Sequence, residues 1–129
     1  MSEENVEVVR RLNEAFAARD IDALVAAHHP DAEVRNLRSQ LVGPYRGHAE
    51  IRRMAEETYG MAPDFRIRVD EIRDCGSRVV LLGRQHGTDG GVPLDEVLAE
   101  VYEMQAGKVL GSQDYATVEE ALRAAKRSE

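Results

Sequence analysis

The chain is short of cysteine, of positive charge and of long apolar runs. Cys75 is the one cysteine in 129 residues, so no disulfide can form within the chain. The net charge of -7 disfavours nucleic acid and anionic membrane surfaces, which bind clustered Lys and Arg. No apolar run approaches the roughly 18 residues of a membrane helix, and the acidic start Met1-Ser2-Glu3-Glu4 is unlike a signal peptide. We therefore expect a cytoplasmic protein with no nucleic-acid or membrane partner.

What is present is the composition of an ordinary globular domain. The chain is 43% hydrophobic and 32% charged, and its length predicts a single domain over residues 1–129. Apolar residues recur at spacings of three and four from Val6 to Phe16, which predicts an amphipathic helix over about residues 3–18. Asp20 is placed to cap a second helix, which we expect Pro30 to end. A third helix is predicted over His48 to Tyr59.

Strands are predicted by alternation and by turn residues. The first runs from Ala32 to Leu37, and Gly43 to Gly47 is a loop by composition. Out-of-phase apolar residues predict a bulge near Asp70-Glu71 in the next strand. The continuously apolar Val79 to Leu82 predicts a strand covered on both faces. Further predicted elements are a hairpin turn at 88–91, strands at 94–104 and 108–115, and a closing helix whose capping box is Thr117 and Glu120.

The predicted order is α-α-β-α-β-β-β-β-α, without an internal repeat or a linker. Helices grouped before a run of hairpin-linked strands predict an α+β domain with a mostly antiparallel sheet. The pattern alone goes no further than this fold class.

Several short segments, in this order and spacing, resemble the SnoaL-like branch of the NTF2-like superfamily. They are Asn5 to Arg11, Asp20-Ile21-Asp22-Ala23-Leu24, His29-Pro30-Asp31, Gly43-Pro44-Tyr45-Arg46-Gly47, Gly107-Lys108-Val109 and Glu119-Glu120-Ala121-Leu122. The resemblance implies a cone: a strongly curved sheet wrapped against the N-terminal helices, with a short C-terminal helix and a pocket at the open end. It also implies a homodimer paired through the sheet, and a small hydrophobic molecule as the ligand.

The superfamily includes ketosteroid isomerase, which combines an Asp base with an oxyanion hole of Tyr and protonated Asp. When the chains are aligned on Asp20-Ile21-Asp22, the base falls on Asn36 and the helical Tyr falls on Leu12. An amide takes up no proton at neutral pH, and Leu has no donor. We therefore expect no steroid isomerase activity by that mechanism.

Candidate catalytic residues lie on two predicted strands. His86 shares strand parity with Arg84, so both can face a pocket, and a His suits general acid–base work. The alternative is that they face solvent or a partner subunit. On the next strand Asp95 shares a face with Val97, Ala99 and Val101, and this more apolar face is expected to pack inward. A carboxylate there would have a raised pKa and could act as a base.

The opposite face of that strand carries Glu96, Glu100 and Tyr102. We take Glu96 as a further catalytic candidate if this face is the inner one. The alternative is that the row of acids is solvated or faces a dimer partner. Parity alone leaves the choice open, because a bulge would exchange the two faces.

Ligand-binding candidates are polar residues that can orient a small molecule. Asn36 can offer its amide, and Tyr45 can cover the pocket mouth from its loop. Gln113 and Tyr115 share parity on the last strand and can donate hydrogen bonds, as Arg84 can from the strand that begins at Val79.

We expect no metal or other cofactor. His28 and His29 are adjacent rather than spaced for joint ligation, and no other Cys or His lies near them in a ligand pattern. The pair is expected instead at the C-terminal end of the second helix, where a cation is favoured.

Three functions remain open. The first is isomerase- or cyclase-type proton transfer on a hydrophobic, polar-substituted substrate, which predicts an open cavity with an inward carboxylate or His. The second is a binding module without catalysis, in a cavity lined by neutral polar groups. The third is a dimeric assembly module, whose cone would be filled with side chains. We place a small-molecule pocket first.

Overall fold

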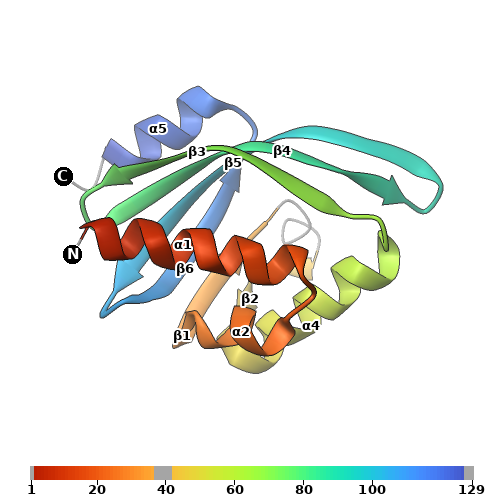
Figure 1. The fold of residues 1–129 in the computed structure, drawn as a ribbon, viewed down its shortest axis with the longest axis horizontal. Helices are drawn as coiled ribbons and strands as arrows, with labels where there is room; N and C mark the ends of the chain where they lie inside the picture. Colours follow the sequence, from red (N-terminus) through yellow and green to blue (C-terminus); the bar gives the residue numbers. More distant parts are fainter. Residues whose placement is uncertain (1, 37–41, 127–129) are drawn as a thin grey trace.

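One curved sheet organises the molecule, with helices on both of its faces (Figure 1). The computed structural model describes residues 2–36 and 42–126. The helices are α1 (Ser2–Ala17), α2 (Ile21–Ala26), α4 (Gly47–Met61) and α5 (Val118–Lys126). Helices α1, α2 and α4 lie against one face, and α5 lies against the other. This is the predicted α+β class, with N-terminal helices and a short C-terminal helix.

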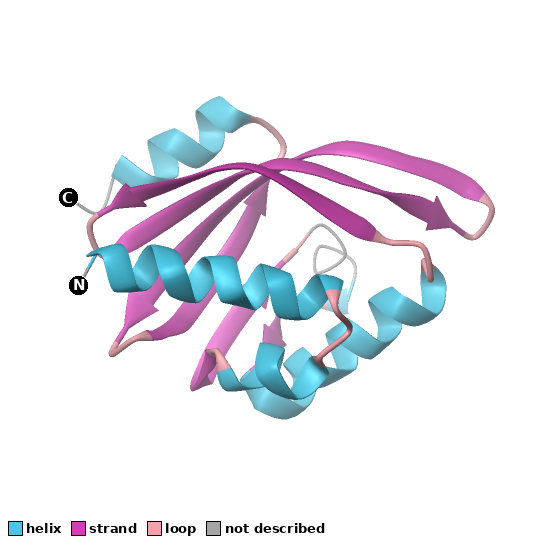
Figure 2. Cartoon of the chain, in the orientation of Figure 1, coloured by secondary structure: helices cyan, strands magenta, loops and turns pink. Residues whose placement is uncertain are grey.

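The six strands lie in the order β2-β1-β6-β5-β4-β3. Only β1 and β6 pair in parallel among the described strands, so the sheet is mostly antiparallel, as predicted. Figure 2 shows the sheet arching over α1, α2 and α4. The bounds of the six strands are β1 (His28–Arg35), β2 (Tyr45–Arg46), β3 (Arg66–Cys75), β4 (Arg78–Asp89), β5 (Val92–Gln105) and β6 (Lys108–Tyr115).

The predicted helix caps are confirmed. Asp20 accepts a hydrogen bond from the backbone N–H of Ala23 and so begins α2. Thr117 accepts a hydrogen bond from the backbone N–H of Glu120, as the N-cap residue of a capping box does, and its hydroxyl donates to the Glu120 carboxylate. Both helices therefore begin where the local sequence satisfies otherwise unpaired N–H groups.

The first strand begins earlier than predicted, and the loop prediction for Tyr45-Arg46 is wrong. Helix α2 ends at Ala26, and Pro30 lies inside β1. Proline is tolerated there because the two-residue β2 pairs only with Glu33 and Val34, and the β1–β6 register shifts between His28 and Glu33. Leu37, the predicted end of this strand, lies outside the described residues.

Two apolar layers cover the sheet. Val79 and Leu81 of β4 face inward with the α1 residues Val9 and Leu12, and Val80 faces outward under α5. All three β4 residues are fully buried, which confirms the prediction of a strand covered on both faces. None of the helices in the described ranges is long and apolar enough to cross a bilayer.

The predicted bulge in β3 is confirmed and helps to bend the sheet. The β3–β4 register shifts between Val69 and Glu71. Gly83 lies opposite this point, and a Cβ atom there would overlap the carbonyl oxygen of Arg68. The backbones of β3 and β4 thus approach each other more closely here than a residue with a Cβ atom would allow.

Candidate functional site

A cavity of about 630 Å³ lies between the inner face of the sheet and helices α1, α2 and α4. Its apolar part comes from the helices, the sheet and the segment between α4 and β3, and includes Leu12, Phe16, Leu24, Met54, Phe65 and Leu98. Phe16 and Phe65 lie beside each other, with ring centroids 5.7 Å apart. The volume falls in the range of sites that enclose small molecules.

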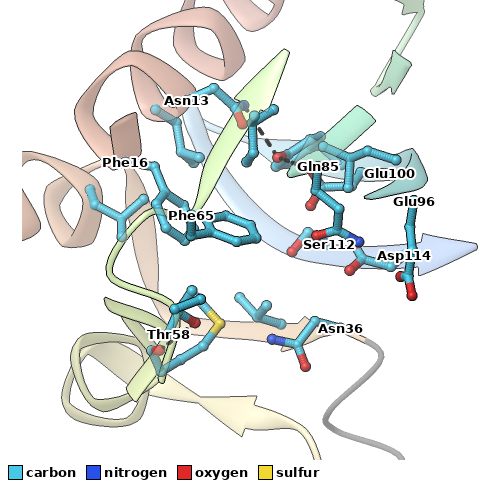
Figure 3. A pocket seen from close by; sticks show the side chains of 18 of the residues that line it. Asn13, Phe16, Asn36, Thr58, Phe65, Gln85, Glu96, Glu100, Ser112 and Asp114 are labelled. Carbon is cyan, nitrogen blue, oxygen red and sulfur yellow. Dashed lines mark hydrogen bonds between the residues drawn. The ribbon is translucent and has the colours of Figure 1, made fainter. Parts of the chain in front are cut away.

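Polar groups gather on one wall of this cavity, on the inner faces of β5 and β6 (Figure 3). Every second residue of β5 from Leu94 to Tyr102 lines the cavity, as strand alternation requires. Glu96 and Glu100 are two of them, and Ser112 and Asp114 face inward from β6. The wall that carries these acids faces Phe16 and Phe65 across the cavity.

Glu100 and Asp114 form a carboxyl pair. They are directly opposite each other on β5 and β6, and their side chains are hydrogen-bonded. Protein atoms surround Glu100 except where it faces the cavity, and this burial raises its pKa, against the opposing hydrogen bonds from Asp114 and Tyr102. Two carboxyl groups in such contact hold one proton between them more readily than two charges.

Tyr102 and Asn13 hold this pair in place. The buried Tyr102 hydroxyl donates to Glu100 Oε1 over 3.0 Å. Asn13 Nδ2 lies 3.4 Å from the same hydroxyl and donates to the carbonyl of Val9 over 2.9 Å. Burial raises the pKa of Tyr102 well above its ordinary value, and the nearby Glu100 adds to the shift. The phenol therefore stays protonated and remains a donor.

His28 brings a neutral imidazole to the cavity wall. Its Nδ1 lies 2.8 Å from the carbonyl oxygen of Leu24, which can only accept, so Nδ1 carries the proton. Burial lowers the pKa of His28. The hydrogen bond to Leu24 raises this pKa by less, and the nearby His48 lowers it further. The expected contact with the C-terminal turn of α2 is present, but His28 lies there as a neutral ring rather than a cation.

Two of the predicted site residues, Asn36 and Glu96, line the cavity. Asn36 follows β1 directly, and the exposed Glu96 lies farther along β5 than the part-buried Glu100. Gln85 of β4 lies opposite Glu96 and also faces inward. Of these three polar side chains, Glu96 is exposed and the other two are part-buried, whereas Tyr102 and Ser112 on the wall are buried.

The prediction that the Asp95 face of β5 packs inward is wrong. Ala99 and Val101 are apolar because they pack under α5 on the outer face of the sheet. The inner face tolerates Glu96 and Glu100 because it borders an open cavity rather than a filled core. The apolar residues of β5 thus identify the face that α5 covers, not the face that lines the cavity.

His86, Arg84 and Asp95 accordingly lie together outside the cavity lining. Asp95 Oδ1 is 3.0 Å from Arg84 Nε and 3.4 Å from His86 Nδ1. The hydrogen bond from Arg84 lowers the pKa of Asp95, with smaller contributions from His86 and Arg68. The structure brings these three predicted residues to each other but not to the cavity.

Tyr45, Gln113 and Tyr115 also lie away from the cavity lining. Tyr45 is fully buried, and its hydroxyl donates to Glu57 Oε1 over 3.3 Å. Gln113 and Tyr115 face outward from β6, where they border a second hollow of about 380 Å³. Their parity is opposite to that of Ser112 and Asp114, so the two sets cannot share a face.

Sequence reasoning missed Asp114, Ser112 and Asn13. The available signal was an acid in mid-strand at a position whose partner strand also carries an acid, Glu100. Within residues 2–36 and 42–126, no group of three or more His, Cys, Asp or Glu side chains is arranged to hold a metal ion.

Solved structures of other proteins have a fold similar to this one. An NTF2-like protein of unknown function from Burkholderia pseudomallei is 24% identical, with 95% of this chain and 98% of that chain covered at a TM-score of 0.79. TerC, co-crystallised with polyporic acid, is 21% identical over 95% and 98% of the two chains, with a TM-score of 0.77. An M. tuberculosis LEH-like epoxide hydrolase is 19% identical over 98% and 92%, with a TM-score of 0.76. The fold is thus an NTF2-like cone.

The family follows from the sequence itself. The family model for the SnoaL-like domain matches residues 9–111, and the chain belongs to this family. The resemblance carried by the short motifs is confirmed. A comparison with curated proteins found no match.

Proposed function

We propose that this protein is a small-molecule enzyme that moves a proton on a mainly apolar substrate held in the cavity. The observation that carries the proposal is the Glu100–Asp114 carboxyl pair on the cavity wall. A proton-bearing carboxyl beside an ionised one supplies both an acid and a base at one place. Isomerase- and cyclase-type reactions need this combination.

In this proposal the ionised carboxyl of the pair takes a proton from the substrate, and the pair returns a proton to another substrate atom. Tyr102 donates to Glu100 and so fixes its orientation, and Asn13 in turn fixes Tyr102. The apolar side chains opposite hold the hydrocarbon part of the substrate and exclude water. Asn36 and Gln85 serve to orient polar substituents.

The comparisons support a small molecule as the ligand. One similar structure is that of an epoxide hydrolase, and another was crystallised with polyporic acid. Their identities of 19% and 21% extend to the fold alone. The proposal for this chain therefore depends on its own carboxyl pair.

The second candidate is a binding module without catalysis. It is favoured by the hydrogen bonds that Glu100 already makes to Tyr102 and Asp114, since a satisfied carboxyl can serve packing alone. The third candidate, an assembly module, required a cone filled with side chains. The open volume of about 630 Å³ counts against it.

The test is proton exchange on a model substrate. Hydroxytetralone and hydroxydecalone carry a donor hydroxyl and exchangeable protons beside a carbonyl, and their exchange in heavy water is followed by proton NMR. We expect exchange to be faster with the wild type than in buffer alone. In E100Q and D114N this excess rate of exchange should fall by about 10²–10⁴-fold. E103Q is the matched control, because Glu103 is an exposed acid on the outer face of the same strand.

Two results of this assay would contradict the proposed proton transfer by the carboxyl pair. A wild-type rate equal to that of buffer for both ketones contradicts proton transfer of this kind. A rate in E100Q and D114N equal to that of E103Q would leave the cavity as a binding site without the proposed base.

We also propose a homodimer that pairs through the outer face of the sheet. The part of this face beyond α5 carries Val97, which is 40% exposed, beside the Arg84–Asp95 ion pair. A V97E variant that runs as a monomer in light scattering, against a wild-type dimer, supports this pairing. A monomeric wild type at micromolar concentration contradicts it.

A further inference from the structure

The charged residues of the described cavity lining are all acids. Glu96, Glu100 and Asp114 line the wall, and none of the described lining residues is Lys or Arg. The nearest arginine of β4, Arg84, points to the opposite face and is paired with Asp95. The described walls therefore offer a ligand negative potential without a compensating cation.

These acids extend along the wall. Glu96 and Glu100 are four residues apart on one strand, which separates their backbones by about 13 Å. A ligand with two fused rings cannot lie against the wall without approaching one of them. Figure 3 shows Glu96 and Asp114 on the same side of the cavity, opposite Phe65.

Two buried polar side chains on the lining have unused hydrogen-bonding groups. The Ser112 side chain is 9% exposed, and its hydroxyl has no hydrogen-bond partner among the described residues. His28 is 3% exposed, and its Nδ1 is bonded to Leu24 while its Nε2 has no partner among the same residues. A ligand in the cavity can supply the missing hydrogen-bond partners of these polar groups. The unprotonated Nε2 can only accept, so it requires a donor from the ligand.

We infer that the cavity selects a ligand that offers hydrogen-bond donors and carries no negative charge, such as an alcohol, a phenol or an amine, and rejects the corresponding carboxylate. This inference rests on the proposed function and specifies its substrate class. A carboxylate in place of a hydroxyl would meet like charge at Glu96 or at the ionised member of the pair. It would also present no donor to His28 Nε2. We expect a loss of at least about tenfold in affinity.

The experiment compares three probes that share one ring system: naphthylmethanol, naphthylmethylamine and naphthoate. Binding is followed by calorimetry at about pH 7.5, and its place by the NMR shifts of the Met54 and Leu98 methyl groups, which line the cavity. We expect the alcohol and the amine to bind and naphthoate to bind at least about tenfold more weakly. In E96Q the discrimination between alcohol and acid should fall by about threefold or more, and in the control E103Q it should not change.

The outcomes separate the two proposals. If naphthoate shifts the cavity methyls and binds as tightly as the alcohol, the charge preference is wrong while the pocket function stands. Equal discrimination in E96Q and E103Q also contradicts the inference, because the acidic wall would then have no local effect. If none of the three probes shifts the cavity methyls, both the inference and the small-molecule function fail.

Discussion

Replacing Glu100 with Gln tests the carboxyl pair through protein stability, without knowledge of the substrate. Gln has nearly the same shape, its oxygen can accept from Tyr102, and its amide can donate to Asp114. The substitution therefore keeps the contacts and removes one ionisable group. Any difference that depends on pH reports the ionisation of the pair.

The sign of the effect follows from the raised pKa of Glu100. A raised pKa means that the folded state keeps a proton over a pH range in which the unfolded state has lost it. Its contribution to stability is fully present below the unfolded pKa of about 4.3 and is lost as pH rises through the folded pKa. Gln has no such loss, so E100Q should gain stability relative to wild type as pH rises.

The magnitude is up to about 1.4 kcal/mol for each unit by which the pKa is raised. For a chain of this length, about 1 kcal/mol corresponds to about 3–5 °C in Tm. At acid pH the exchange of one hydrogen-bonded carboxyl for an amide should change stability by no more than about 1.5 kcal/mol.

Thermal unfolding of wild type, E100Q and E103Q from about pH 5 to about pH 9 measures this difference. We expect the Tm of E100Q minus that of wild type to rise across the range, and that of E103Q to show no comparable rise. A difference for E100Q that stays flat would refute the reasoning, since Glu100 would then titrate as an ordinary surface acid.

Two further substitutions test the support of the site and the bend of the sheet. Tyr102→Phe removes the donor to Glu100 and should destabilise the fold by about 1–3 kcal/mol in urea unfolding; an unchanged midpoint would show that the hydroxyl is dispensable. Gly83→Ala should cost more than about 2 kcal/mol because its Cβ would overlap the Arg68 carbonyl. Gly60→Ala should be neutral or stabilising, because a Cβ there would meet nothing within 4 Å beyond its own helix backbone and chain neighbours. Similar stabilities for the two alanine variants would contradict the close approach of β3 and β4.

The helices and most strands could be predicted because their signals are local. Caps such as Asp20 and Thr117 act within three residues, so the sequence alone identifies them. The start of β1 could not be predicted in this way. Proline is expected to end a helix, and Pro30 was predicted to do so. It lies inside β1 instead, where β2 is too short to pair with it and no N–H is needed from it.

The site depended on which face of β5 is the inner one, and that is not a local property. The Asp95 face is apolar because α5, more than ten residues downstream, returns to cover it. The face with Glu96 and Glu100 is inside because a cavity can hold carboxyls that a packed core would exclude. Sequence patterns report that a face is covered but not whether a core or a returning helix covers it.

The carboxyl pair itself depends on one register shift. At the turn, Gln105 pairs with Lys108 and Met104 with Val109, a register that would place Gln113 opposite Glu100. The irregularity between Glu103 and Met104 moves the pairing by one residue, so Asp114 lies opposite Glu100 instead. A regular hairpin would have matched the acid with an amide and sent Asp114 to the outer face. The chemistry proposed for this protein therefore exists because β5 and β6 are not a regular hairpin, and an account from alternation alone could not have reached it.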